Sequence, residues 1–184
     1  MDATRVALVA IDGDNVDRTL YRELSRQLVP AVLVQVVQGL LPDHRVWVKG
    51  FYTVPMQDEA MYRQQEYFDQ AQAAGIEVKR WRRGSLRDQT IGYPDTWVMD
   101  AVRAELNQFD TLVLVTADRD YTPLLVECHE RGKNVVVLTP QPVAWPTGVT
   151  VHELDWLETQ HPDLMRALRT RPPWVLLGNS SAHR

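Results

Sequence analysis

The sequence predicts an α/β domain in which a mainly parallel sheet is flanked by helices. Short apolar runs rich in valine, isoleucine and leucine alternate with segments of helical periodicity, which is typical of βαβ units. Two of these runs end abruptly in acidic turns, at residues 12–15 and 118–120. The 184 residues, 45% of them hydrophobic, are enough for one core and too few for two ordinary domains.

The first half of the chain is expected to alternate between strand and helix. Its first apolar run has no polar alternation, as expected of a strand that is buried on both faces. Leucine and valine then recur at four-residue intervals, which predicts a helix that Pro30 kinks or splits. The predicted elements are strand, helix, strand, helix and strand over residues 5–11, 17–40, 45–53, 58–74 and 76–81.

The second half continues the same alternation. The predicted elements are helix, strand, helix and strand over residues 95–107, 110–115, 121–130 and 134–138. After Pro140 the pattern weakens, and only short helices over 153–158 and 162–170 are expected before a frayed tail. The expected division is one domain over 1–160, followed by a C-terminal helix and tail over 161–184.

Composition excludes several classes of protein. The net charge is -4 and the pI is about 5.7, whereas a dedicated duplex-DNA binder is usually basic, so any contact with nucleic acid must come from a local patch. No apolar run approaches the roughly 20 residues of a membrane helix, and residues 1–5 contain no apolar signal segment. The single cysteine, Cys128, excludes an internal disulfide, so a cytoplasmic location is expected. A homodimer is one possible oligomeric state of the chain.

Acidic and amide side chains follow two of the predicted buried strands. Asp12, Asp14 and Asn15 come after the first, and Asp118 and Asp120 come after the other. Ligands of an open parallel sheet bind outside the carboxyl ends of its strands, so these groups converge if the two strands are central neighbours. Converging carboxylates repel one another unless a cation lies among them. Oxygen ligands without His or Cys favour Mg²⁺ or Mn²⁺, which suits the hydrolysis of phosphodiesters.

A structural role is the alternative for each of these residues taken singly. Asp and Asn are common turn and N-cap residues after a strand. Asp17 stands where a helix N-cap is wanted, and Asp14 is the weakest candidate of the first turn. The occurrence of both acidic clusters at the ends of buried strands favours a metal site over turn chemistry alone.

Two stretches of the chain resemble the motifs of NYN domains, a branch of the PIN-like nuclease superfamily. Val9–Asn15 is similar to the opening motif of that family, and Thr116–Leu124 resembles its Ser/Thr-Gly-Asp-x-Asp-aromatic turn. Asp100, within Trp97–Val102, is the best match to the aspartate of the family's middle helix. The resemblance covers the chain from about residue 6 to about residue 138.

The resemblance implies a Rossmann-like PIN-type fold and metal-dependent ribonuclease activity. By the same resemblance, the acidic site that would hold Mg²⁺ or Mn²⁺ consists of Asp12, Asp100, Asp118 and Asp120. Asn15 would orient Asp12 or a phosphate, and the Thr116 hydroxyl would support the site.

The middle helix departs from the family pattern. Gly92 follows Ile91 where the family has Lys, and Pro94 aligns with the first of the family's two aspartates. Asp95 and Asp100 are five residues apart, which corresponds to a rotation of about 140° on a helix, so they do not share a face. Asp95 is therefore interpreted as an N-cap.

A basic segment is the candidate surface for the substrate. It consists of Lys79, Arg80, Trp81, Arg82, Arg83 and Arg87. Cations beside an aromatic ring suit a flexible RNA strand, with phosphate contacts from Lys and Arg and base stacking on Trp81. The alternative is a solvated loop whose arginines pair with surface acids. Thr116 and Arg119 are counted with the substrate-binding residues, although Arg119 would also partly quench the acidic charge.

The leading hypothesis is a divalent-metal-dependent endoribonuclease that hydrolyses phosphodiester bonds of single-stranded or structured RNA. The resemblance implies products with a 5′-phosphate and a 3′-hydroxyl. One alternative is a catalytically weakened RNA-binding or regulatory adaptor, motivated by Asp95 and Arg119. Another is a phosphatase of the haloacid-dehalogenase type, because Asp12-Gly13-Asp14 resembles its nucleophile turn, but no Lys lies between Lys79 and the second acidic cluster.

Overall fold

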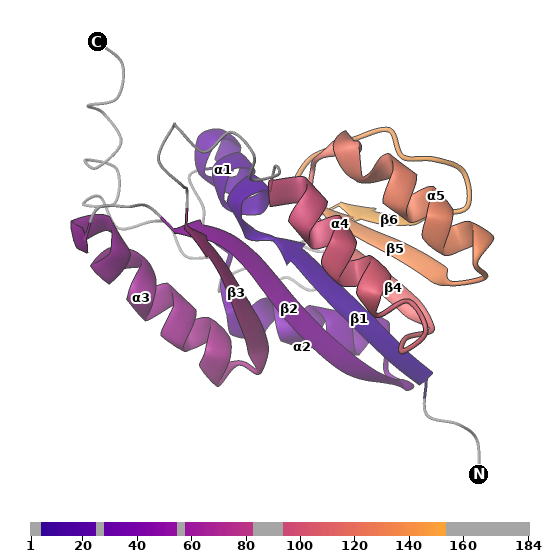
Figure 1. Cartoon of the computed structure of the whole chain (residues 1–184), viewed down its shortest axis with the longest axis horizontal. Helices are drawn as coiled ribbons and strands as arrows, with labels where there is room; N and C mark the ends of the chain where they lie inside the picture. Colours follow the sequence, from indigo (N-terminus) through magenta and orange to yellow (C-terminus); the bar gives the residue numbers. More distant parts are fainter. Residues whose placement is uncertain (1–4, 25–27, 55–57, 83–93, 154–184) are drawn as a thin grey trace.

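The computed structural model describes residues 5–24, 28–54, 58–82 and 94–153, with side chains except at 21–24, 54, 58–63, 81–82 and 94. Within these ranges, a six-stranded sheet lies between two layers of helices (Figure 1). All five strand pairings are parallel, which confirms the predicted α/β class.

The elements alternate along the chain much as the periodicity predicts. In order they are β1 (Arg5–Asp12), α1 (Gly13–Leu24), α2 (Pro30–Leu40), β2 (His44–Val54), α3 (Asp58–Ala73), β3 (Ile76–Arg82), α4 (Pro94–Ala104), β4 (Thr111–Val115), η1 (Arg119–Tyr121), α5 (Thr122–Glu130), β5 (Asn134–Thr139) and β6 (Thr150–Glu153).

The strand order β3-β2-β1-β4-β5-β6 makes β1 a central strand. The chain builds outward from β1 to β3 and then crosses to the other side, where it adds β4, β5 and β6. The order therefore reverses between β1 and β4, and this switch point is where open α/β sheets bind ligands. Ile11 of β1 lies opposite Val115 of β4, so the carboxyl ends of the two strands are level.

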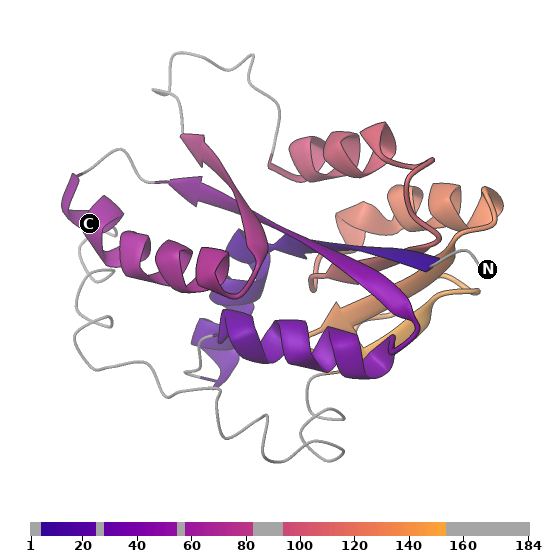
Figure 2. The ribbon, with the colours of Figure 1, turned by 90° about the horizontal axis from the view of Figure 1, so that it is seen from below.

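Alternate residues of β1 pack into two separate cores. Val9 and Ile11 contact the core formed with α1, α2 and α3, whereas Leu8 and Ala10 contact the core formed with α4 and α5. Figure 2 shows α2 and α3 on one side of the sheet and α4 and α5 on the other. A strand covered on both faces explains the unbroken apolar run that the sequence shows.

Three local differences from the predicted elements have physical reasons. Helix α1 begins at Gly13, directly after β1, so the first acidic turn is a strand-to-helix junction. Pro30 begins α2; at this first helical position a backbone N–H would have no partner within the helix, so its absence in proline costs nothing. Strand β6 was not predicted, because this four-residue edge strand is exposed or half-buried and has no apolar run. The helix expected over 153–158 is wrong at Glu153, which lies in β6, and the rest of that range and residues 162–184 lie outside the described residues.

The tight junction after β1 depends on Gly13. A Cβ at this position would overlap the ring of Tyr52 on the neighbouring strand. The close approach lets the chain turn into α1 at once, which keeps Asp12 at the sheet edge and places Asn15 in the first helical turn.

Candidate metal centre

Asp12 is held at the buried end of β1 by two hydrogen bonds. Its side chain is 4% exposed. One carboxylate oxygen accepts from the Asn15 backbone N–H at 3.2 Å, and the other accepts from the Thr116 hydroxyl at 3.2 Å. The first bond comes from α1 and the second from the segment after β4, so both strand ends fix the orientation of this carboxylate.

Thr116 connects Asp12 to Asp118. While its hydroxyl donates to Asp12, the same oxygen accepts from the Asp118 backbone N–H at 3.1 Å. Asp118 then caps the short helix η1, because its carboxylate accepts from the Asp120 N–H at 3.0 Å. These contacts hold the half-buried Asp118 side chain beside Asp12.

Asp95 completes a group of three converging carboxylates. It lies in the first turn of α4, the helix that leads from the β3 side of the sheet to β4. One carboxylate oxygen from each of Asp12, Asp95 and Asp118 lies within 4.8 Å of those of the other two. The acidic triad, as these three residues are called below, therefore stands at the switch point between β1 and β4.

Burial and mutual repulsion perturb the triad. Burial is the main cause that raises the pKa of Asp12 to about 6, and it outweighs the opposing effects of the Asn15 backbone N–H and of the nearby Tyr121 and Thr116 hydroxyls. The pKa of Asp95 is also raised, first by burial and then by the negative charges of Asp118 and Asp120. A divalent cation among the three groups would offset both effects.

The raised pKa of Asp12 makes a prediction about stability and pH in the absence of divalent ions. The folded chain binds this proton more tightly than the unfolded chain, so the free energy of unfolding falls as pH rises from about 4 to about 6. The contribution is about 3 kcal/mol or less. Denaturant titrations with a chelator, compared between wild type and Asp12→Asn, isolate this group. A difference between the two proteins that is flat across the range would contradict it.

Asn15 and Asp14 have structural partners. The Asn15 side-chain oxygen accepts from the Ala117 N–H at 2.9 Å and so ties α1 to the end of β4, while its backbone contacts Asp12. Asp14 accepts from both the backbone N–H and the hydroxyl of Thr53 on β2. The Asp14 carboxylate is thus directed to the neighbouring strand.

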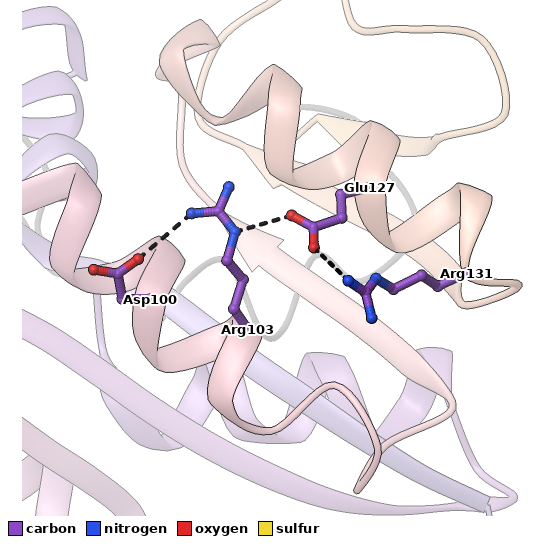
Figure 3. Close-up of polar contacts among 4 residues, drawn as sticks. All are labelled: Asp100, Arg103, Glu127 and Arg131. Atoms are coloured by element: carbon purple, nitrogen blue, oxygen red, sulfur yellow. Dashed lines mark hydrogen bonds and ion pairs between the residues drawn. The ribbon is translucent and has the colours of Figure 1, made fainter.

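Asp100 and Asp120 lie outside the triad. Asp100 is exposed on the outer surface of α4, where its carboxylate lies 3.5 Å from Arg103. Figure 3 shows that Arg103 also forms an ion pair with Glu127 of α5, and that Glu127 forms a second ion pair with Arg131. Asp120 is exposed; its backbone N–H donates to Asp118, and its negative charge helps to raise the pKa of Asp95. The prediction placed Asp100 in the cluster and Asp95 outside it, and the structure has the reverse arrangement.

The difference between the predicted and the observed aspartate of the middle helix has a definite origin. Helical rotation indicated that Asp95 and Asp100 do not share a face, but it cannot say which of the two faces the sheet edge. The usable signal is that the N-terminal turn of a crossover helix lies nearest to the carboxyl ends of the strands. Asp95 is in that first turn, whereas Asp100 lies more than one turn further along.

The predicted basic segment is only partly described. Lys79 pairs with Glu77 on its own strand. Arg80 donates to Gln65 at 3.1 Å and lies over the ring of Phe68 at 4.5 Å, so it packs against α3. The side chains of the other four members lie outside the described residues: Trp81, Arg82, Arg83 and Arg87.

Two residues near the triad were missed by the sequence reasoning. Arg18 is exposed on α1, and its charge acts on Asp95. Tyr121 is 0% exposed, and its hydroxyl lies near Asp12 and Asp95. Burial, followed by the charges of those carboxylates, raises the pKa of Tyr121, so the hydroxyl keeps its proton. Its position in the second acidic turn predicts an aromatic ring in the core, but not a hydroxyl beside the carboxylates.

The donor set fits a hard divalent cation. It offers carboxylate oxygens from three elements and no His or Cys ligand, which is the chemistry that Mg²⁺ and Mn²⁺ prefer. The Tyr121 hydroxyl beside it is buried and has no hydrogen bond of ordinary length and angle to any described residue. A buried polar group of this kind calls for a further partner at the site.

A parallel sheet with an acidic triad at its switch point defines a PIN-like, nuclease-type α/β domain. The family model of the NYN domain matches residues 6–147, and the chain belongs to this family.

One solved structure is similar to this chain in fold. A protein of unknown function from Vibrio parahaemolyticus superposes with a TM-score of 0.69 at 17% identity, covering 84% of this chain and 97% of that chain. A T5 protein that was co-crystallised with metal ions reaches a TM-score of only 0.35 at 13% identity, covering 85% of this chain and 60% of that chain. The first likeness supports the fold, and the second is too low to add to it. No curated protein matches the sequence.

In the part of the chain that is described, no helix combines the length and the apolar character needed to cross a membrane.

Proposed function

We propose that this NYN domain is a divalent-metal-dependent endoribonuclease, which hydrolyses phosphodiester bonds of single-stranded or structured RNA. The observation that carries the proposal is the acidic triad, in which Asp12, Asp95 and Asp118 come from distant parts of the chain to one edge of the sheet. Three carboxylates at one point are costly to keep charged unless they serve a cation.

The triad would hold Mg²⁺ or Mn²⁺ through its carboxylate oxygens. When bound, such an ion supplies a Lewis acid for the phosphate and lowers the pKa of a coordinated water. The chain supplies the orientation, because Thr116 and the Asn15 backbone fix Asp12, and Thr116 also fixes the start of the turn that carries Asp118. Asp120 is proposed to add negative charge beside the ion rather than a direct ligand.

The RNA is proposed to approach along the β3 side of the same edge. All strands are parallel, so the carboxyl end of β3 opens to the same edge as the triad. Lys79 and Arg80 are engaged with Glu77 and with α3, which leaves phosphate contacts to the basic residues that follow. Arg18, whose charge acts on Asp95, and Arg119, an exposed cation next to Asp118 in the sequence, are proposed to add contacts to the phosphates next to the cleaved bond.

Neither alternative gains support from the site. The adaptor hypothesis rested in part on an Asp95 that faces away from the cluster, and Asp95 belongs to the triad. A haloacid-dehalogenase mechanism needs the second Asp of the first turn free beside the nucleophile, but the Asp14 carboxylate is bound by Thr53.

The direct test is cleavage of RNA by the purified full chain. With Mn²⁺, the wild type is expected to cleave a labelled single-stranded RNA internally, and Asp118→Asn is expected to reduce the rate by about 100-fold or more, since a bound metal contributes several kcal/mol to catalysis. Asp100→Asn is the matched control, because Asp100 is an exposed aspartate outside the triad.

Equal rates in the wild type and in Asp118→Asn would contradict the proposal, since they would indicate a contaminant or another site. Tight RNA binding without cleavage under any divalent ion would favour the adaptor.

A further inference from the structure

We infer that Tyr121 is a positioning residue of the metal site, whose buried hydroxyl hydrogen-bonds to the Asp12 carboxylate when the triad holds a divalent ion. The inference rests on the proposed function for the presence of the ion. The inference assigns a role to the Tyr121 hydroxyl, which is needed neither to fill the core nor to form the acidic triad.

The first support is the burial of the hydroxyl without a partner. Tyr121 is 0% exposed and is among the largest fully buried side chains. Its hydroxyl makes no hydrogen bond of ordinary geometry with any residue that the structure describes. Leaving a buried donor unpaired is unfavourable, so the group is expected to have a partner in another state of the protein.

The second support is the place of the hydroxyl. The ring packs in the core formed with α4 and α5, so the hydroxyl is held by the same packing that positions those helices. The hydroxyl lies near Asp12 and Asp95, two members of the triad from different elements, and the charges of both act on it. A tyrosine hydroxyl at neutral pH is a donor, and a charged carboxylate is the acceptor with which it makes its strongest hydrogen bonds.

The third support is the function of such contacts in metal sites. Carboxylates that bind a metal are usually hydrogen-bonded from outside, and this contact sets their orientation. Asp12 already accepts from Thr116 and Asn15, and Tyr121 would add a donor from the core side. A phenylalanine would fill the same core space, so the hydroxyl is the part of Tyr121 that this role explains.

The test is Tyr121→Phe, measured by calorimetric titration with Mn²⁺ and by thermal unfolding with a chelator. Affinity for Mn²⁺ is expected to fall by roughly tenfold, the lower end of the usual effect of an outer hydrogen-bond partner. The melting temperature without ions is expected to stay the same or rise, since the variant removes an unpaired buried hydroxyl. A purely structural role would lower the melting temperature and leave the affinity unchanged.

Tyr67→Phe is the matched control. It also removes a tyrosine hydroxyl, but one that lies 3.3 Å from the hydroxyl of Tyr52 and outside the triad. It is expected to bind Mn²⁺ as the wild type does.

The possible outcomes separate the two proposals. Equal Mn²⁺ affinity in the wild type and in Tyr121→Phe would overturn the role of the hydroxyl and leave the metal site intact. A wild type that does not bind Mn²⁺ would overturn both. As a measurement on the wild type itself, Mg²⁺ is expected to slow the exchange of the Tyr121 hydroxyl proton, observed as a proton resonance that Tyr121→Phe lacks.

Discussion

Asp12→Asn is expected to abolish ion-dependent cleavage of RNA while it stabilises the ion-free protein. Asp12 is the most buried member of the triad, and its pKa is raised to about 6, mainly by burial. At pH 7 without ions, the folded chain therefore carries an unfavourable buried charge. An uncharged amide removes it, so the free energy of unfolding should increase by about 1–3 kcal/mol. Cleavage should fall by about 100-fold or more, because the ion loses its central ligand.

The predicted increase in stability together with the loss of cleavage distinguishes a functional role of Asp12 from a general effect on folding. A substitution that merely damages the fold lowers both stability and activity. Replacing a functional residue whose buried charge destabilises the fold instead lowers the activity and raises the stability. Chemical denaturation in the presence of a chelator measures the first quantity, and a labelled RNA with Mn²⁺ measures the second. A destabilised Asp12→Asn protein with retained cleavage would reverse both expectations.

Asp95→Asn is expected to weaken Mn²⁺ binding far more than Asp100→Asn, although both aspartates lie on the same helix. Asp95 contributes a carboxylate oxygen within 4.8 Å of those of Asp12 and Asp118, whereas Asp100 lies on the outer surface beside Arg103. Loss of the Asp95 charge should reduce the affinity for Mn²⁺ by roughly 100-fold or more. Loss of a residue that only hydrogen-bonds to a metal ligand costs at most about 100-fold, and Asp95 is proposed to be a ligand itself.

The Asp100→Asn variant serves as the control within the same helix. The Asp100–Arg103 pair is exposed, and such pairs contribute between 0 and about 1 kcal/mol, so stability and Mn²⁺ affinity should remain near those of the wild type. Calorimetric titration of the two variants side by side decides the matter. If Asp100→Asn lost affinity and Asp95→Asn kept it, the family-based assignment of the middle aspartate would be right and the triad wrong.

The sheet and two members of the triad could be predicted because they depend on local patterns. A strand that is buried on both faces is apolar throughout, and a polar turn follows where it ends. The sequence therefore indicates both β1 and β4 and the acidic turns after them. The convergence of Asp12 and Asp118 then follows from parallel strands that are neighbours.

The remaining features depend on the tertiary structure. The rotation of α4 about its own axis decides between Asp95 and Asp100, and that rotation is set by packing of Val98 and Val102 against the sheet. The role of Tyr121 depends on the position of its buried hydroxyl. The presence of an aromatic residue in the motif does not predict that position. Strand β6 gains its place by pairing with β5 rather than by an apolar pattern of its own.

The most direct test of the account is to locate Mn²⁺ by anomalous diffraction in crystals of the full chain. We expect one ion at the edge between β1 and β4, in contact with carboxylate oxygens of Asp12, Asp95 and Asp118 together. Mn²⁺ bound only at another place, with these three carboxylates free of it at saturating concentration, would contradict the metal centre and with it the proposed cleavage of RNA.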